Sequence, residues 1–346
     1  MSRFKTKIFT TTQAYDDYEL EVFEYDREDA EYFVRQASVV DIGFSVFGFF
    51  LNIFHFLILT RKSLRTQFIF QVFIIICLSD LILFSGTLIW NYLDYIVGSV
   101  CNKPRPYSHQ IWRLVIMSSQ SIMKNLSLLL VLLLSGLQIF SFELKFPIKD
   151  LIVFGIAGLC TAWQVWYFNH YTIVTARDCG VEPKLKFKSY ELSIDVDFLA
   201  DQKLIHDCMK IVPFFLYNIS FVIQFVQLRK VIRKKSGEND QIIFVLMLTF
   251  SFLLSEYIDA TVILFDHALL KPYYLIQEYF IRLRIVANTL TTMNCVTHCF
   301  ICMLMSSDYM DTVRKCLRRE KKEKINAQKN VPSVTLTIES SHGDVA

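Results

Sequence analysis

Charged residues are scarce in this sequence. They make up 20% of its 346 residues, whereas hydrophobic residues make up 53% and phenylalanine alone occurs 31 times. A soluble domain of this length would carry more charge and fewer apolar side chains. The formal net charge of +3 is also too small to indicate a nucleic-acid partner. The composition therefore predicts an integral membrane protein.

Several signals are missing along the chain. The start shows no basic segment followed by a short apolar run and a small-residue cleavage site, so we expect no cleaved signal peptide. No soluble domain, internal repeat or low-complexity linker separates the apolar runs. We also find no convergent set of nucleophile, base and metal ligands. The sequence therefore predicts neither an enzyme nor a bound cofactor.

Seven apolar runs are long enough to cross a bilayer, which takes about 20 residues in a helix. Lys and Arg gather after the first, third, fifth and seventh runs, and by the positive-inside rule the N-terminus is then extracellular and the C-terminus cytoplasmic. We predict an all-α membrane protein, a bundle of seven transmembrane helices in the plasma membrane. The predicted spans are residues 38–60, 67–95, 111–142, 150–172, 208–231, 240–265 and 273–305.

The segments outside the transmembrane domain (38–305) differ from it in composition. Residues 1–37 mix acidic side chains with tyrosine and are too polar to fold alone, so we expect an extracellular disordered segment. Residues 306–324 form a basic amphipathic segment that suits a helix on the anionic lipids of the inner leaflet, where Cys316 is a palmitoylation candidate. Residues 325–346 are expected to form a disordered cytoplasmic tail.

Polar groups within the predicted spans are costly and need a reason. Asn52, Asp80 and Asn294 lie in the first, second and seventh spans. They predict a shared network in which Asp80 accepts hydrogen bonds or coordinates a cation. The alternative is that each makes a separate contact between two helices.

Four ionisable residues fall in the predicted outer half of the bundle. Glu256 and Asp259 are three residues apart in the sixth span, so they share one helix face. Arg284 comes from the seventh span and Lys124 from the third. Together they predict a water-filled pocket for a charged or amidated ligand, and structural ion pairing is the alternative.

The last span also carries Cys295, His298, Cys299 and Cys302 at a spacing that is typical of metal sites. The first and last of these lie about 10.5 Å apart along a helix axis. A tetrahedral zinc ion with bonds of about 2.1–2.3 Å does not reach both. We therefore predict no metal site and interpret the cysteines as small packing residues.

The same stretch resembles the last helix of rhodopsin-like receptors, in the variant found in the nematode serpentine receptor class W family, which is FMRFamide-receptor-like. Asn294 matches the Asn of the N-P-x-x-Y motif, and His298 stands at its Tyr, so the resemblance adds His298 to the polar network, near the cytoplasmic end. A family-like M-S-S-x-Y follows at residues 305–309. Further matches over residues 38–318 are the spacing of Asn52 and Asp80, Pro213, and residues 144–147 and 255–256.

The resemblance implies a G-protein-coupled receptor that senses an extracellular, neuropeptide-like ligand and signals to a heterotrimeric G protein. A chemosensory receptor for small molecules is the alternative. A transporter fits less well, because proline is nearly absent from the spans and inverted repeats are lacking. The family's arginine at the end of the third span is missing, since Gln138 or Phe140 holds that position. Gln138, Arg229 and Arg233 are the residues expected to face the G protein.

The resemblance further implies a disulfide between Cys101 and Cys179, which would tie the third span to the loop after the fourth. Cys208 is the rival partner. In that loop, residues 190–198 alternate apolar and polar side chains, and this period of two predicts a strand. Together with residues 184–188 it predicts a β-hairpin over the pocket in the second extracellular loop, with an irregular loop as the alternative.

Overall fold

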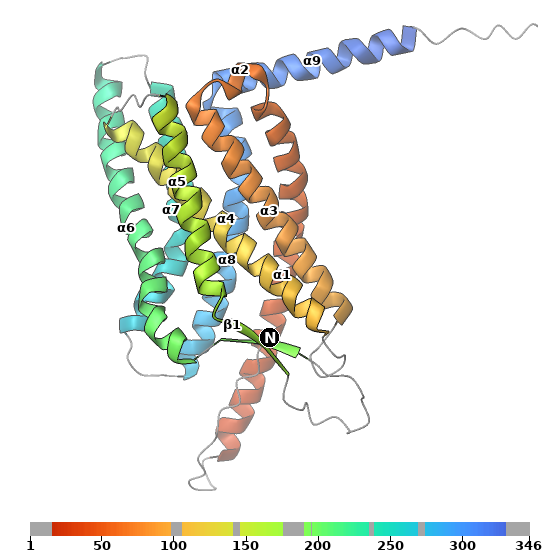
Figure 1. The fold of residues 1–346 in the computed structure, drawn as a ribbon, viewed down its shortest axis with the longest axis vertical. Helices are drawn as coiled ribbons and strands as arrows, with labels where there is room; N and C mark the ends of the chain where they lie inside the picture. Colours follow the sequence, from red (N-terminus) through yellow and green to blue (C-terminus); the bar gives the residue numbers. More distant parts are fainter. Residues whose placement is uncertain are drawn as a thin grey trace, which may run out of the picture.

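Seven long helices pack side by side in one bundle in the computed structural model (Figure 1). Each is long and apolar enough to cross a membrane. The seven-helix prediction is therefore confirmed. The structure describes residues 16–97, 106–140, 146–175, 190–194, 196–234, 239–268 and 274–329. The long helices are α1 (Asp16–Leu59), α3 (Phe68–Val97), α4 (Tyr107–Phe140), α5 (Phe146–Phe168), α6 (Val196–Lys234), α7 (Asn239–Ala268) and α8 (Tyr274–Met305).

Two further helices lie at one end of the bundle. The helical turn α2 (Lys62–Arg65) follows α1, and α9 (Ser307–Lys329) begins beside it and extends outward from that end (Figure 1). Tyr309, Thr312 and Val313 of α9 are buried, whereas its Arg and Lys side chains that are described are exposed. The helix continues to Lys329, beyond the predicted boundary at residue 324.

A two-stranded antiparallel sheet lies at the other end of the bundle (Figure 1). β1 (Tyr171–Thr175) pairs with β2 (Tyr190–Ile194), so that Tyr171 faces Ile194. The predicted strand is therefore present, but it ends at residue 194 because α6 begins at Val196. The sequence did not identify β1 as its partner. The β-branched run of β1 pairs with β2, and residues 184–188 lie outside the described residues.

The helix α1 begins far before the first predicted span. Residues 16–37 are helical and not disordered as we expected, and this part of α1 projects beyond the bundle (Figure 1). Glu, Ala, Leu and Arg are good helix formers, and neither Gly nor Pro interrupts the chain between residues 16 and 42. A helix that the apolar span has nucleated therefore extends through the acidic segment at little cost.

Gly48 allows α1 to pack closely against α3. A β-carbon added at Gly48 would overlap the ring of Phe84, a buried side chain of α3. By contrast, a β-carbon at Gly155 in α5 would meet nothing within 4 Å. The α1–α3 contact thus depends on glycine at position 48, whereas position 155 has room for a side chain.

Candidate functional site

A cavity of about 580 Å³ lies among α1 and α3–α8. Its lining includes Trp163 and Gln164 near the end of α5, Lys210 in the first half of α6, and Arg284 near the start of α8. These positions place the cavity in the half of the bundle nearer to the β1–β2 hairpin. Its volume falls within the range of pockets that bind small organic ligands.

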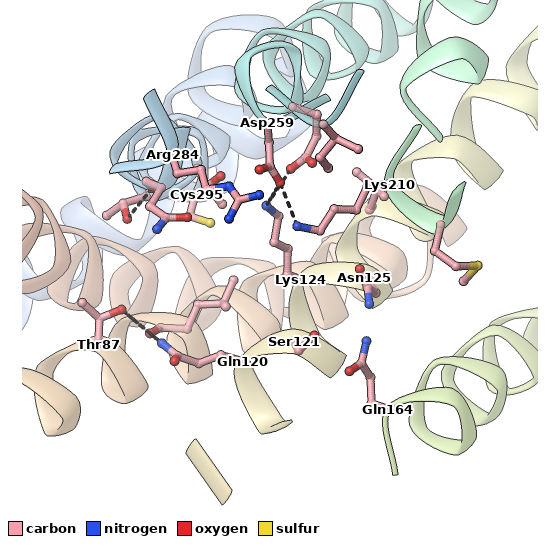
Figure 2. Close-up of a pocket in the computed structure, with 18 of the residues that line it drawn as sticks. Thr87, Gln120, Ser121, Lys124, Asn125, Gln164, Lys210, Asp259, Arg284 and Cys295 are labelled. Atoms are coloured by element: carbon pink, nitrogen blue, oxygen red, sulfur yellow. Dashed lines mark hydrogen bonds and ion pairs between the residues drawn. The ribbon is translucent and has the colours of Figure 1, made fainter. Parts of the chain in front are cut away.

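Ion pairs cross this cavity between three helices (Figure 2). The Lys124 ammonium of α4 lies 3.2 Å from Glu256 and 4.0 Å from Asp259, both on α7. The Lys210 ammonium of α6 lies 3.2 Å from the same Asp259 carboxylate oxygen that faces Lys124. Asp259 therefore links two lysines from two different helices, and α4, α6 and α7 are connected through one charged cluster.

Two further ionisable residues line the cavity on the α1 and α8 side. Arg284 of α8 is exposed to the cavity, and its charge acts on Asp259. Asp41 of α1 accepts a hydrogen bond of 2.6 Å from the Thr292 hydroxyl of α8. The cavity therefore presents cations and anions along its length, and not a continuous apolar wall.

Amide side chains form another part of the wall. Gln120 of α4 donates to the Leu83 carbonyl and to the Thr87 hydroxyl of α3, at 3.0 and 3.1 Å. Gln164 of α5 and Asn125 of α4 also line the cavity (Figure 2), and Gln164 is only 1% exposed. Amide groups both donate and accept, so this wall offers hydrogen bonds to a polar ligand.

The structure brings together the four residues that the sequence singled out. Lys124, Glu256, Asp259 and Arg284 all line the cavity. Sequence reasoning missed Lys210, Asp41 and Gln164. Lys210 and Asp41 are ionisable residues within two or three positions of the start of a predicted span, and hydropathy alone does not separate such residues from ordinary helix ends. Gln164 carried no signal beyond its polarity within a span.

A second polar cluster lies deeper in the bundle. The His298 Nδ1 of α8 donates to the Asp80 carboxylate of α3 at 2.8 Å, and both side chains are 1% exposed or less. The His298 ring stacks on Phe252 with a centroid distance of 5.1 Å. His298 is thus a buried partner of Asp80, and it lies in the half of α8 that ends at Met305, before α9.

Asn52 and Asn294 do not bond to Asp80 directly. The Asn52 amide donates to the backbone carbonyls of Gly48 and Cys295, at 3.0 and 3.4 Å. Asn294 accepts a hydrogen bond from the Ser251 hydroxyl of α7. The predicted single network is therefore split into an Asp80–His298 pair, an α1–α8 contact and an α7–α8 contact.

Tyr309 in the first turn of α9 reaches into the end of the bundle. Its hydroxyl lies 2.7 Å from His55 Nδ1 of α1, and neither side chain is measurably exposed. Burial raises the pKa of the Tyr309 hydroxyl well above its ordinary value, so the group stays neutral at physiological pH. Asp308 beside it accepts a hydrogen bond of 2.9 Å from Gln67, which joins α9 to the segment before α3.

The remaining predicted residues are distributed at this same end. Gln138 of α4 is half-buried, and Arg229 of α6 is exposed and stacks on Phe225 at 4.7 Å. Arg233 lies in the last turn of α6. Cys316 of α9 is half-buried against the hydrophobic core. The predicted disulfide lies outside the described residues, because both Cys101 and Cys179 do, and Cys208 is an exposed free thiol.

The cysteines at metal-like spacing in α8 pack in the interior of the bundle. Cys295, Cys299 and Cys302 are buried, and Cys302 belongs to the main hydrophobic cluster. Within the part of the chain that the structure describes, no group of His, Cys, Asp and Glu side chains is arranged to hold a metal ion.

The family model of the serpentine type 7TM GPCR chemoreceptor Srw matches residues 39–320. This match covers most of the chain and all seven long helices. No curated protein matches the chain. The chain therefore belongs to the Srw family of serpentine seven-transmembrane G-protein-coupled chemoreceptors.

Proposed function

We propose that this Srw-family receptor binds a water-soluble, charged ligand from outside the cell in the cavity among α1 and α3–α8. It would pass the signal to a heterotrimeric G protein at the opposite end of the bundle. The observation that carries the proposal is the ion-paired cluster of Lys124, Lys210, Glu256 and Asp259 in the cavity wall.

Charged groups in a cavity favour polar ligands for a physical reason. A ligand that displaces water from Lys124 and Glu256 must replace the hydrogen bonds that the water made, or the charged groups lose solvation without compensation. An apolar volatile compound offers no such bonds, whereas a charged or amide-bearing compound does. The cavity therefore supports a soluble chemical signal better than an apolar odorant.

The position of the cluster also suggests how binding would reach the other helices. A ligand that bonds to Asp259 competes with Lys124 and Lys210, which hold α4 and α6 to α7. Such a ligand has different affinities for the paired and the separated helices, which is the requirement for shifting a conformational equilibrium. The Ser251–Asn294 contact would pass a movement of α7 on to α8.

The topology follows from the same proposal. The cavity and the β1–β2 hairpin share one end of the bundle, and the basic helix α9 lies at the other (Figure 1). Lys and Arg near the ends of apolar spans favour the cytoplasmic side. We propose that the hairpin end is extracellular, that α9 is cytoplasmic, and that Gln138, Arg229 and Arg233 face the G protein.

A neuropeptide-like ligand is the second candidate, and the hairpin supports it. The Gln110 amide of α4 donates to the Tyr190 carbonyl of β2 at 2.6 Å, and the Tyr107 and Tyr190 rings meet edge to face. These contacts hold β2 at the cavity end of α4. An extended peptide suits such a sheet edge, because its backbone can form hydrogen bonds with the strand there.

The test is a screen of the full-length receptor in cells that carry a calcium or cAMP reporter. Three panels are compared: charged water-soluble metabolites, short peptides and uncharged volatile compounds. We expect responses from the charged panel or the peptides, and their loss in Lys124→Gln at unchanged surface expression. The exposed residue Arg314, which pairs with Asp311 on α9, provides the control variant Arg314→Gln. Responses restricted to uncharged volatiles would refute the proposal.

A further inference from the structure

We infer that the cavity contains a carboxylate-binding subsite at Arg284, and that the ligand also offers a hydrogen-bond donor to Gln164. This inference rests on the proposed function, because it names the chemical class of the ligand in the same cavity. Two sources share this chemistry: a free amino-acid-like metabolite and the free C-terminus of a peptide.

Among the described residues of the cavity wall, Arg284 is a cation without a hydrogen bond or a close ion pair, although its charge acts on Asp259. Among the described residues, its guanidinium makes neither a hydrogen bond nor an ion pair within 4.0 Å, although it lines the cavity and its side chain is exposed there. Lys124 and Lys210, by contrast, are held by Glu256 and Asp259. Of the cations that line the cavity in the described part of the chain, the Arg284 guanidinium is therefore the one available to a ligand.

The chemistry of a guanidinium selects its partner. Its planar array of N–H donors matches the two oxygens of a carboxylate, which gives short, charge-assisted hydrogen bonds. A cationic ligand group would instead have to displace a lysine from Glu256 or Asp259. A ligand carboxylate thus binds at Arg284 without breaking the existing ion pairs.

Gln164 provides an independent indication of a ligand. Its side chain is 1% exposed, and its Oε1 has no hydrogen-bond partner among the described residues. A buried amide oxygen without a donor is unfavourable, so such atoms commonly mark a missing group. Gln164 lines the same cavity as Arg284, and the two lie on different parts of the wall in the view of Figure 2.

The two subsites determine which chemical groups the ligand carries at two of its positions. A carboxylate would lie at Arg284, and an amine, amide or hydroxyl hydrogen would point to Gln164. An amidated peptide lacks the C-terminal carboxylate, so this subsite disfavours it relative to the same peptide as a free acid. The free-acid and amide forms of one compound therefore provide a matched pair of probes that differ only at this group.

The experiment measures the thermal unfolding midpoint of the purified full-length receptor in detergent as each probe is titrated. The probes are amino acids and their amino-acid amides, and a set of tetrapeptides as free acids and as C-terminal amides. We expect the acid form of at least one pair to bind about tenfold more tightly than its amide, the effect of a charge-assisted bond. The amino-acid and tetrapeptide arms separate the two sources.

The variants assign the preference to the two residues. Arg284→Gln should abolish the preference for the acid, Arg284→Lys should retain part of it, and Gln164→Leu should weaken both forms of the pair. Arg314→Gln on α9 is the matched control. The inference is overturned if the amides bind as tightly as the acids, if neither form stabilises the receptor, or if the acid preference survives in Arg284→Gln. The proposed receptor function fails separately, if no panel of the cell-based screen elicits a response.

Discussion

At the scale of single residues, the bundle stabilises ionisable groups by pairing them across helices. Asp80 and His298 make such a pair at 2.8 Å in a site that excludes solvent. A buried charge without its partner is strongly unfavourable, whereas a well-packed apolar pair in the same place is often tolerated. The two side chains should therefore be coupled in stability.

We expect His298→Ala to lower the free energy of unfolding by about 3–5 kcal/mol, because it leaves the Asp80 carboxylate buried and unpaired. The double variant Asp80→Leu with His298→Phe should be more stable than His298→Ala alone. The measurement is denaturant-induced unfolding of the purified receptor in micelles. The exposed pair Asp311–Arg314 is the control, and Asp311→Asn should cost less than about 1 kcal/mol. Simple additivity of the two substitutions would contradict the coupling.

The glycines of α1 and α5 make opposite predictions for the same substitution. Gly48→Ala should destabilise the receptor by about 1–3 kcal/mol, because the new methyl group would displace the Phe84 ring. Gly155→Ala should be neutral or stabilising by up to about 1 kcal/mol, because the site is open and alanine favours a helix. Thermal unfolding of the two variants in parallel tests the α1–α3 contact. Equal effects would show that the helices do not approach as described.

At the scale of elements, α9 is joined to the bundle by polar contacts. Tyr309 bonds to His55, Asp308 accepts from Gln67, and the Thr312 and Ser63 hydroxyls lie 3.2 Å apart. These contacts connect α9 to α1, to α2 and to the segment before α3. Loss of the buried Tyr309 hydroxyl should therefore make local opening of α9 more frequent.

We expect Tyr309→Phe to raise the rate of maleimide labelling at Cys316 roughly tenfold. The variant lacks the buried hydrogen bond that must break when α9 opens locally, so its opening costs less free energy. Labelling is followed by mass spectrometry at the Cys316 peptide, in a Cys208→Ser background that removes an exposed thiol. Arg314→Gln on the outer face of α9 should leave the rate unchanged. An unchanged rate in Tyr309→Phe would mean that the hydroxyl does not hold α9.

The boundaries of elements show where local sequence information ends. The apolar runs located all seven spans, because each must bury about 20 residues in the membrane. The helices α1 and α6 extend well beyond those runs, through polar residues 16–37 and 196–207 that hydropathy does not count. The partner of β2 was also missed, because β1 follows directly on α5 and looked like its continuation.

At the scale of the whole molecule, the candidate site depends on helix rotation, which no single span encodes. The spacing of Glu256 and Asp259 predicted correctly that they share a face of α7, since that follows from helix geometry. Their pairing with Lys124 of α4 and Lys210 of α6 depends on how three helices pack. For the same reason the sequence did not show that Asp80 bonds to His298 and not to Asn294.

The proposed topology predicts which end of the chain antibodies reach. An epitope tag at the N-terminus should be stained on intact cells, and a tag at the C-terminus only after permeabilisation, because basic flanks remain in the cytoplasm. Lowering the positive charge at the end of α6, with Arg229 and Arg233 changed to Gln, should leave the topology intact, since three other basic flanks remain. Staining of the C-terminal tag on intact cells would reverse the proposed orientation.

The most direct measurement of the central proposal is agonist-stimulated nucleotide exchange on purified Gα subunits by the receptor in lipid nanodiscs. The probes are the charged water-soluble metabolites, the peptides and the uncharged volatiles. We expect a charged metabolite or a peptide to stimulate exchange, with the half-maximal concentration raised at least about tenfold in Lys124→Gln, as loss of one charged contact implies. Stimulation by uncharged volatiles alone, with the same potency in wild type and Lys124→Gln, would contradict the proposal.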